Sequence, residues 1–178
     1  MSWMTASSNP LPTPGYCGCM SLPRKMRLAA MNGGYVLSQE PILPEYCAIS
    51  AKSGTDVPGK TLVAEVESEG PFVLTLRGEN PDDVLTIRLN EDNEIETERS
   101  VSPLLAPNGA YNADDFRRTR VARLREGGVR LKVVVDEWIV EVYADDGLYT
   151  HGLLFFARDG VRRIEWTNSA SVALAALH

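Results

Sequence analysis

The chain has 178 residues, of which 44% are hydrophobic and 24% charged, and its formal net charge is −6. A chain of this size can bury one core without disulfides or metal ions, and no apolar run approaches the roughly 18 residues of a membrane span. It also has no dense basic stripe, so we expect neither a membrane nor a nucleic acid as a partner.

The N-terminal residues 1–15 are rich in Ser, Pro and Thr, and they predict a linker ahead of a domain that spans residues 16–178. This segment lacks the basic and apolar regions of a secretory signal, so we expect the chain as given to stay in the cytoplasm. The three cysteines, Cys17, Cys19 and Cys47, cannot all pair internally and lack Cys-x-x-Cys spacing. We expect them to be reduced thiols.

Apolar residues occupy every second position in four stretches, 62–66, 72–76, 85–89 and 129–135. Successive side chains of a strand point to opposite sides, so each stretch predicts a strand with one buried face. With the Gly- and Asn-containing turns between them, we count roughly 11 or 12 short strands. The pattern predicts an all-β fold, a two-layer antiparallel β-sandwich of concanavalin-like or jelly-roll-like form, rather than a small closed barrel.

No stretch predicts a long amphipathic helix. The best helical candidate is the tail, Ser169 to Leu177, which could equally be a strand end or a frayed terminus.

Two stretches carry the most information, Gly18 to Met26 (GCMSLPRKM) and Val133 to Gly147 (VVVDEWIVEVYADDG). They resemble the entry strand and a late hairpin of the C-terminal β-sandwich domain of glycoside hydrolase family 32, the invertases, levanases and inulinases that act on β-fructosides. Gly34 to Ile42 (GYVLSQEPI) resembles the family's hairpin return strand. Glu137, Trp138 and Ile139 depart from the Arg-Ser-Ser that is usual in the family.

The resemblance extends to the N-terminus, where Trp3-Met4 and Pro12-Thr13-Pro14 stand in the order in which the family's propeller ends and crosses to the sandwich. It therefore implies that residues 1–15 are a linker or the remnant of the end of a propeller domain. It also implies a parent family that is often secreted.

The resemblance places the family's chemistry on the propeller, in Asn-Asp-Pro-Asn-Gly, Arg-Asp-Pro and Glu-Cys motifs. Retaining glycosidases need two carboxylates about 5 to 5.5 Å apart. None of the three motifs occurs in this sequence. The nearest partial matches, residues 80–83 and 158–160, do not have the residues of the motifs and are typical of turns. We therefore predict no catalytic residue and no cofactor. His151 and His178 have no ligand cluster, so we predict no metal site.

The sequence leaves several functions open. The first is a non-catalytic structural or interaction domain of a split or truncated β-fructosidase, with a propeller domain or a second copy in a C2 homodimer as its partner. The alternative is a carbohydrate-binding module for fructan or a sucrose-related sugar, with Trp138, Tyr111, Asp114 and Tyr149 as candidate ligands. A third function, a glycosidase in its own right, would need an active site that we do not find.

Glu141 lies between Val140 and Val142 in an otherwise apolar strand. A buried carboxylate is costly unless it is paired, so we predict a structural contact with Arg24 from the other matched stretch. Tyr143, on the same side of that strand as Ile139, is predicted to be core. The acid pairs, including Asp145-Asp146, are predicted to be solvated turn residues.

Overall fold

The computed structural model describes residues 20–57, 61–100, 117–157, 159–167 and 170–177. The elements that lie wholly within these residues are strands: β1 (Arg24–Met31), β2 (Gly34–Pro41), β3 (Ile49–Ser50), β4 (Thr55–Asp56), β5 (Thr61–Ser68), β6 (Phe72–Arg77), β7 (Val84–Leu89), β8 (Glu94–Arg99), β9 (Arg118–Ala122), β10 (Val129–Asp136), β11 (Ile139–Ala144), β12 (Tyr149–Leu154), β13 (Arg163–Trp166) and β14 (Ala170–Ala176). None of the described residues forms a helix with the length and apolar character that a membrane crossing needs.

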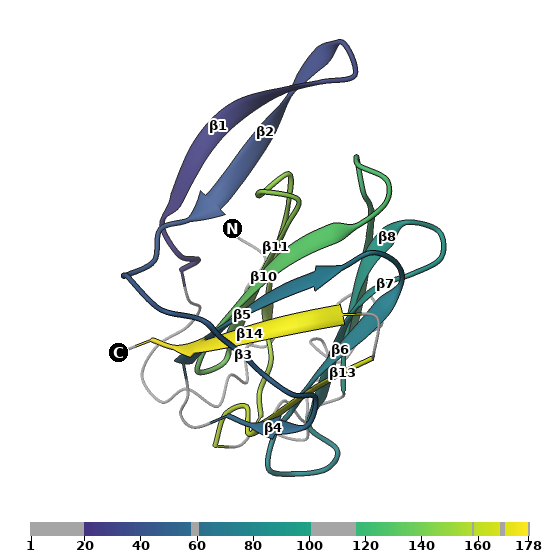
Figure 1. Ribbon diagram of the computed structural model, residues 1–178. Coiled ribbons are helices and arrows are strands. Elements are labelled where there is room, and N and C mark those ends of the chain that lie inside the picture. The colour runs from purple at the N-terminus through teal and green to yellow at the C-terminus, as the bar shows by residue number, and fades with distance from the viewer. Residues whose placement is uncertain (1–19, 58–60, 101–116, 158, 168–169, 178) are drawn as a thin grey trace, which may run out of the picture.

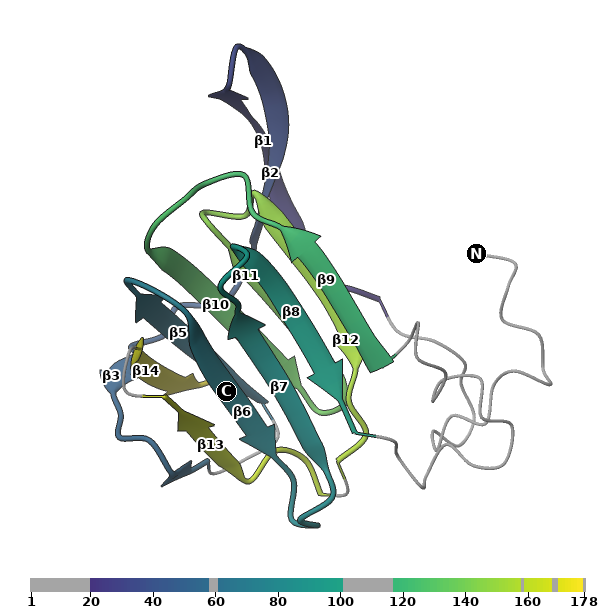
Figure 2. The same ribbon diagram turned by 90° about the vertical axis from the view of Figure 1, so that its right-hand side faces the viewer.

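The strands form two six-stranded sheets and a separate hairpin (Figure 1). Sheet I has the order β12-β11-β10-β5-β14-β3, and sheet II has the order β4-β13-β6-β7-β8-β9. Every pairing in both sheets is antiparallel. The two sheets pack face to face (Figure 2), which confirms the predicted two-layer antiparallel sandwich.

The main core fills the space between the two sheets, as the alternation of the sequence predicts. Leu62 and Val133 enter it from sheet I, and Leu74, Ile87 and Ile164 enter it from sheet II; each is at most 2% exposed. Full burial of such a side chain stabilises the fold by about 1.5 to 3 kcal/mol. The strands predicted over 62–66, 72–76, 85–89 and 129–135 are β5, β6, β7 and β10.

The described residues hold 14 strands rather than the predicted 11 or 12. Two of the additional strands, β3 and β4, are two residues long and therefore leave no periodic pattern in the sequence. The tail that was the best helical candidate is β14, which pairs with β5 over Ala170 to Ala176 and with β3 on its other side. Backbone pairing with distant strands here outweighs the helix propensity of an Ala-rich segment.

A second, smaller core covers the outer face of sheet I. Val63, Val134 and Tyr143 are buried there, packed against Leu22, Leu43, Tyr46 and Leu177. Tyr143 is thus a core residue as predicted, but it lies on the outer side of sheet I and not between the sheets. This core holds the segments that flank the β1–β2 hairpin against the sandwich.

Candidate interaction surface

The β1–β2 hairpin, called the arm below, is joined to the sandwich through Glu141. The Glu141 side chain is 2% exposed on β11. Its Oε1 accepts a hydrogen bond from the backbone N–H of Leu22 (2.6 Å), and its Oε2 accepts one from Arg24 Nη2 (2.8 Å) and another from the Tyr143 hydroxyl. The predicted pair of Arg24 and Glu141 is confirmed. Because these hydrogen bonds involve ionised groups, they are stronger than neutral ones and fix the start of β1 on sheet I.

Tyr143 adds to this attachment in two ways. Burial and the neighbouring Glu141 carboxylate raise the pKa of Tyr143 well above its ordinary value, so its hydroxyl keeps the proton that it donates. The guanidinium carbon of Arg24 also lies 5.4 Å from the centre of the Tyr143 ring, within the range of a cation–π contact.

The second strand of the arm is anchored at the turn between β11 and β12. Ser38 Oγ donates a hydrogen bond to the carbonyl of Asp146 (2.6 Å), and the N–H of Gln39 donates one to the carbonyl of Gly147 (2.8 Å). Gly147 has a φ of +81°, and a Cβ added there would lie 2.2 Å from the Gln39 carbonyl oxygen. Only glycine combines this turn with so close an approach of β2.

Replacing Gly147 by alanine is expected to destabilise the protein more than the same change at Gly127. Gly127 has a φ of +79° and nothing within 4 Å of an added Cβ, so Gly127→Ala measures the backbone cost alone, about 1 to 2 kcal/mol. Gly147→Ala should lose about 1 to 3 kcal/mol more, because β2 must move away. Urea unfolding of both variants checks this, and equal losses would contradict the close packing of the arm on the turn.

Beyond this base, the arm projects from the sandwich in both views (Figures 1 and 2). The register places Leu28 opposite Leu37 and Ala30 opposite Tyr35, and side chains opposite each other in an antiparallel pair share a face. Met26 lies on the same face and is 59% exposed; Leu28 is 72%, Tyr35 76% and Leu37 42% exposed.

We call these five residues the apolar face of the arm. A hairpin alone is marginally stable in water, and contiguous exposed apolar residues mark interaction sites. The apolar face therefore has the properties of a surface that a partner covers.

A polar groove of about 440 Å³ lies between the base of the arm and the outer face of sheet I. Glu40 lines it from β2, while charged residues of sheet I and its turns form the opposite side: Glu65, Glu67, Arg130, Lys132 and Asp146. Lys132 Nζ lies 3.5 Å from Glu65 Oε1, and Arg130 Nη2 lies 2.9 Å from Asp146 Oδ1. The groove therefore offers both charged donors and carboxylate acceptors.

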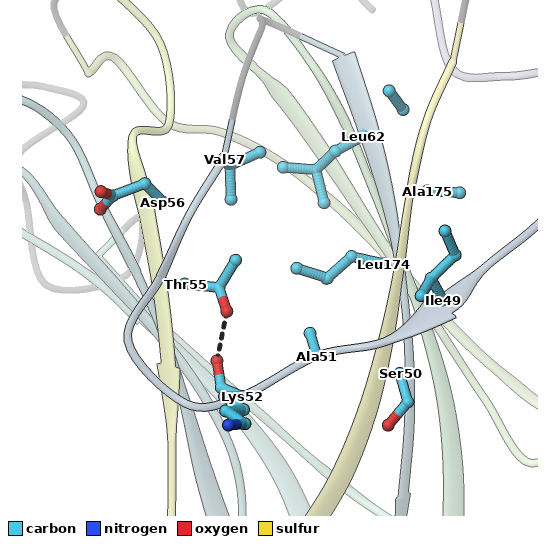
Figure 3. Close-up of a pocket in the computed structure, with 11 residues that line it drawn as sticks. Ile49, Ser50, Ala51, Lys52, Thr55, Asp56, Val57, Leu62, Leu174 and Ala175 are labelled. Carbon is cyan, nitrogen blue, oxygen red and sulfur yellow. Dashed lines mark hydrogen bonds between the residues drawn. The ribbon is translucent and has the colours of Figure 1, made fainter.

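A second cavity, of about 420 Å³, opens at one side of the sandwich beside β3 and β4, which are edge strands of sheet I and sheet II. Figure 3 shows Val57, Leu62 and Leu174 extending into it. Among the described residues that line it, Asp56 is the one carboxylate, whereas glycoside hydrolysis uses a pair.

The structure places the two predicted sugar ligands that it describes, Trp138 and Tyr149, at different sites. Trp138, at the β10–β11 turn, is half-buried with its ring centre 5.6 Å from that of Phe156. Tyr149 lies near the β11–β12 turn, at the opposite end of β11, and is 7% exposed in the main core. Because it is buried, its ring is not an exposed platform for a sugar. The same burial raises the pKa of Tyr149 to about 12. Tyr111 and Asp114 lie outside the described residues.

The sequence did not identify the apolar face of the arm as a site. Alternation is weak there, because Met26, Leu28 and Ala30 alternate with Lys25, Arg27 and a further alanine. The signal that could have found it is the presence of large apolar side chains on both strands of a hairpin that opens a domain, with no third strand predicted beside it.

A model of the family described as glycosyl hydrolases family 32 C terminal matches residues 47–177 of this chain. The chain belongs to this family. The matched region begins after the arm and covers both sheets of this family 32 C-terminal domain. A comparison with curated proteins found no match.

Solved structures of several enzymes share the fold. The exo-inulinase from Aspergillus awamori matches with a TM-score of 0.71 and 18% identity, over 94% of this chain and 37% of that chain. The sucrose-6-phosphate hydrolase from Lactobacillus gasseri matches with a TM-score of 0.66 and 20% identity, over 86% of this chain and 33% of that one. A β-fructofuranosidase from Schwanniomyces occidentalis has a TM-score of 0.66 and 15% identity, over 88% of this chain and 40% of that one. This family 32 domain thus spans between a third and two fifths of the length of these enzymes.

Proposed function

We propose that this family 32 C-terminal domain is a non-catalytic structural module that packs against a family 32 propeller domain through the apolar face of the arm. The observation that carries the proposal is the exposure of Met26, Leu28, Tyr35 and Leu37 on an arm whose base is fixed to the sandwich. The similar enzymes extend well beyond the part that this chain matches, which supports a catalytic part elsewhere.

The geometry of the arm suits this role. Glu141 and the carbonyls of Asp146 and Gly147 hold its two strands at the base, so the apolar face is presented in a defined orientation. A preorganised surface loses little conformational entropy on binding. A few residues near the centre of an interface contribute most of its binding free energy, often 2 kcal/mol or more each, and Tyr is among the commonest of them. Tyr35 is the most exposed residue of the apolar face.

Binding to a propeller domain tests the proposal. Leu28 and Leu37 face each other across the arm, and Leu28→Ser combined with Leu37→Ser is expected to weaken binding to a family 32 propeller encoded in the same genome about 100-fold or more. Ile49→Ser is the matched control, because Ile49 is 71% exposed but lies outside the arm. Calorimetry measures both; a double variant that binds as tightly as the control would refute docking through the arm.

The polar groove favours a second function, the binding of a hydroxyl-rich sugar. Its carboxylates and the cations Arg130 and Lys132 are the groups that hydrogen-bond sugar hydroxyls. Calorimetry with levan, inulin and sucrose distinguishes the two functions. Binding heat that Arg130→Ala abolishes would favour sugar binding in the groove. If none of the three sugars gives heat, sugar binding is excluded and packing against a propeller is the function that is retained.

A further inference from the structure

The outer edge of β1 has no strand beside it in the part of the chain that the structure describes, since β1 pairs with β2 alone. This edge is formed by the backbone, and it is distinct from the apolar face, which is formed by side chains. It runs the length of the arm, away from the sandwich (Figures 1 and 2). Unpaired edges of this length are templates for another strand.

The turn of the arm determines which backbone groups point outward. Asn32 and Gly33 have φ values of +49° and +79°, as in a two-residue hairpin turn, so the flanking residues Met31 and Gly34 form a hydrogen-bonded pair. Hydrogen-bonded pairs recur at every second residue of an antiparallel pair, so the odd-numbered residues of β1 direct their N–H and C=O groups to β2. The even-numbered residues Met26, Leu28 and Ala30 therefore direct their N–H and C=O groups to the open edge.

An independent contact supports this assignment. Gln39 lies opposite Met26, so its N–H should point away from β1, and it does, since it donates to the carbonyl of Gly147. The outer edge of β2 is thus occupied at this point by the β11–β12 turn. The outer edge of β1 has no such contact among the described residues.

Charge selects one register for a second copy of β1 on this edge. In the first register, Leu28 lies opposite Leu28 of the second copy, and seven residues of β1 pair. Both cations then face uncharged residues of the second copy, since Arg27 faces Ala29 and Lys25 faces Met31. In a second register, with Met26 opposite Leu28, Arg27 would face Arg27 of the second copy. In a third, with Met26 opposite Met26, Arg27 would face Lys25. Like charges directly opposite each other are destabilising. A shift in the other direction leaves fewer residues paired.

We propose that two copies of this chain associate through the outer edge of β1, in a two-fold antiparallel four-stranded sheet of the order β2-β1-β1-β2 with Leu28 on the axis. Leu28 contacts Leu28 of the second copy, and Met26 packs beside Ala30. Because the arms run in opposite directions, the two sandwiches lie at opposite ends of the joined sheet. The two apolar faces lie side by side on one side of it and remain open to propeller domains, so the pairing does not depend on the proposed function.

Proline substitutions test the edge without disturbing the arm. The N–H of Leu28 points away from β2, so Leu28→Pro keeps the arm but removes a donor from the outer edge of β1. Sedimentation velocity of the full chain is expected to show a dimer for the native protein and a monomer for Leu28→Pro. Leu37→Pro is the matched control, because the N–H of Leu37 points to the outer edge of β2, and it should remain dimeric. A native monomer, a dimeric Leu28→Pro variant or a monomeric Leu37→Pro variant would each overturn the proposal.

A cysteine at the axis tests the register even if a proline variant fails to fold. Residues paired in this way have Cα atoms about 5.5 Å apart, within the span of a disulfide. In a chain with Cys17, Cys19 and Cys47 replaced by serine, Leu28→Cys is expected to form a disulfide-linked dimer on mild oxidation, and Lys25→Cys is not. Cross-linking at Lys25 in place of Leu28 would contradict this register.

Discussion

Glu141→Ala is expected to lower the free energy of unfolding by about 3 to 5 kcal/mol, near the lower end because Arg24 is partly exposed. The change removes the acceptor for three donors at once: the Leu22 N–H, the Arg24 guanidinium and the Tyr143 hydroxyl. A donor that loses its partner inside the fold retains the cost of having left water. Equilibrium unfolding in urea measures the loss.

Glu165→Ala is the matched control for this prediction. Glu165 also pairs with an arginine at 2.8 Å, Arg77, but both side chains are more than a third exposed. Exposed ion pairs contribute about 0 to 1 kcal/mol. If Glu141→Ala costs no more than Glu165→Ala, Glu141 does not hold the arm as the structure indicates.

Arg123→Met is expected to have a comparably large effect, a loss of about 3 to 5 kcal/mol. The Arg123 side chain is 0% and that of Asp145 5% exposed, and two hydrogen bonds of 2.9 and 3.0 Å join them. Arg123 also donates to Asn93 and to the carbonyls of Gly127 and Gly128. Removing it leaves a buried carboxylate and three further acceptors without their donor.

Arg125→Met provides the comparison for Arg123. Arg125 pairs with Asp146 in the same turn at 3.1 Å, but both side chains are nearly half exposed, so its loss should cost about 1 kcal/mol or less. Thermal and urea unfolding of both variants check the difference. If Arg123→Met is as stable as Arg125→Met, the buried pair of Arg123 and Asp145 does not stabilise the β11–β12 turn, to which the arm is anchored.

The sandwich could be predicted from the sequence because its central strands bury one face each. Leu62 and Val66 on β5 and Leu74 and Leu76 on β6 alternate with polar or outward-facing residues, and that period is a property of the strand itself. The tail could not be assigned in the same way. Ala170 to Ala176 forms a strand only because β5 and β3 lie on either side, and neither is near in sequence.

The two buried carboxylates show where the sequence is informative about charge. Glu141 stands inside an apolar strand, where a carboxylate requires a partner, and Arg24 was found on that basis. Asp145 stands beside Asp146 and Gly147 in a turn, and it was expected to be solvated. It does adopt a turn conformation, with a φ of +53°, but Arg123 from the β9–β10 loop pairs with it, and both side chains are buried.

The arm was predicted as a hairpin, but its open face and edge could not be. Whether Leu28 and Tyr35 are covered depends on which other strands reach them, and the local pattern carries no such information. The same limit applies to Trp138 and Tyr149, whose aromatic character is compatible with a sugar platform and with a core. Packing places Tyr149 in the core.

Docking of the arm on a propeller domain can be measured by hydrogen exchange of the chain, free and bound to a family 32 propeller domain from the same genome. Docking through the arm predicts that the protection gained on binding is concentrated in the amides of residues 24–41, with the outer face of sheet II unchanged. Protection gained on sheet II, with the arm exchanging as fast as in the free chain, would contradict it.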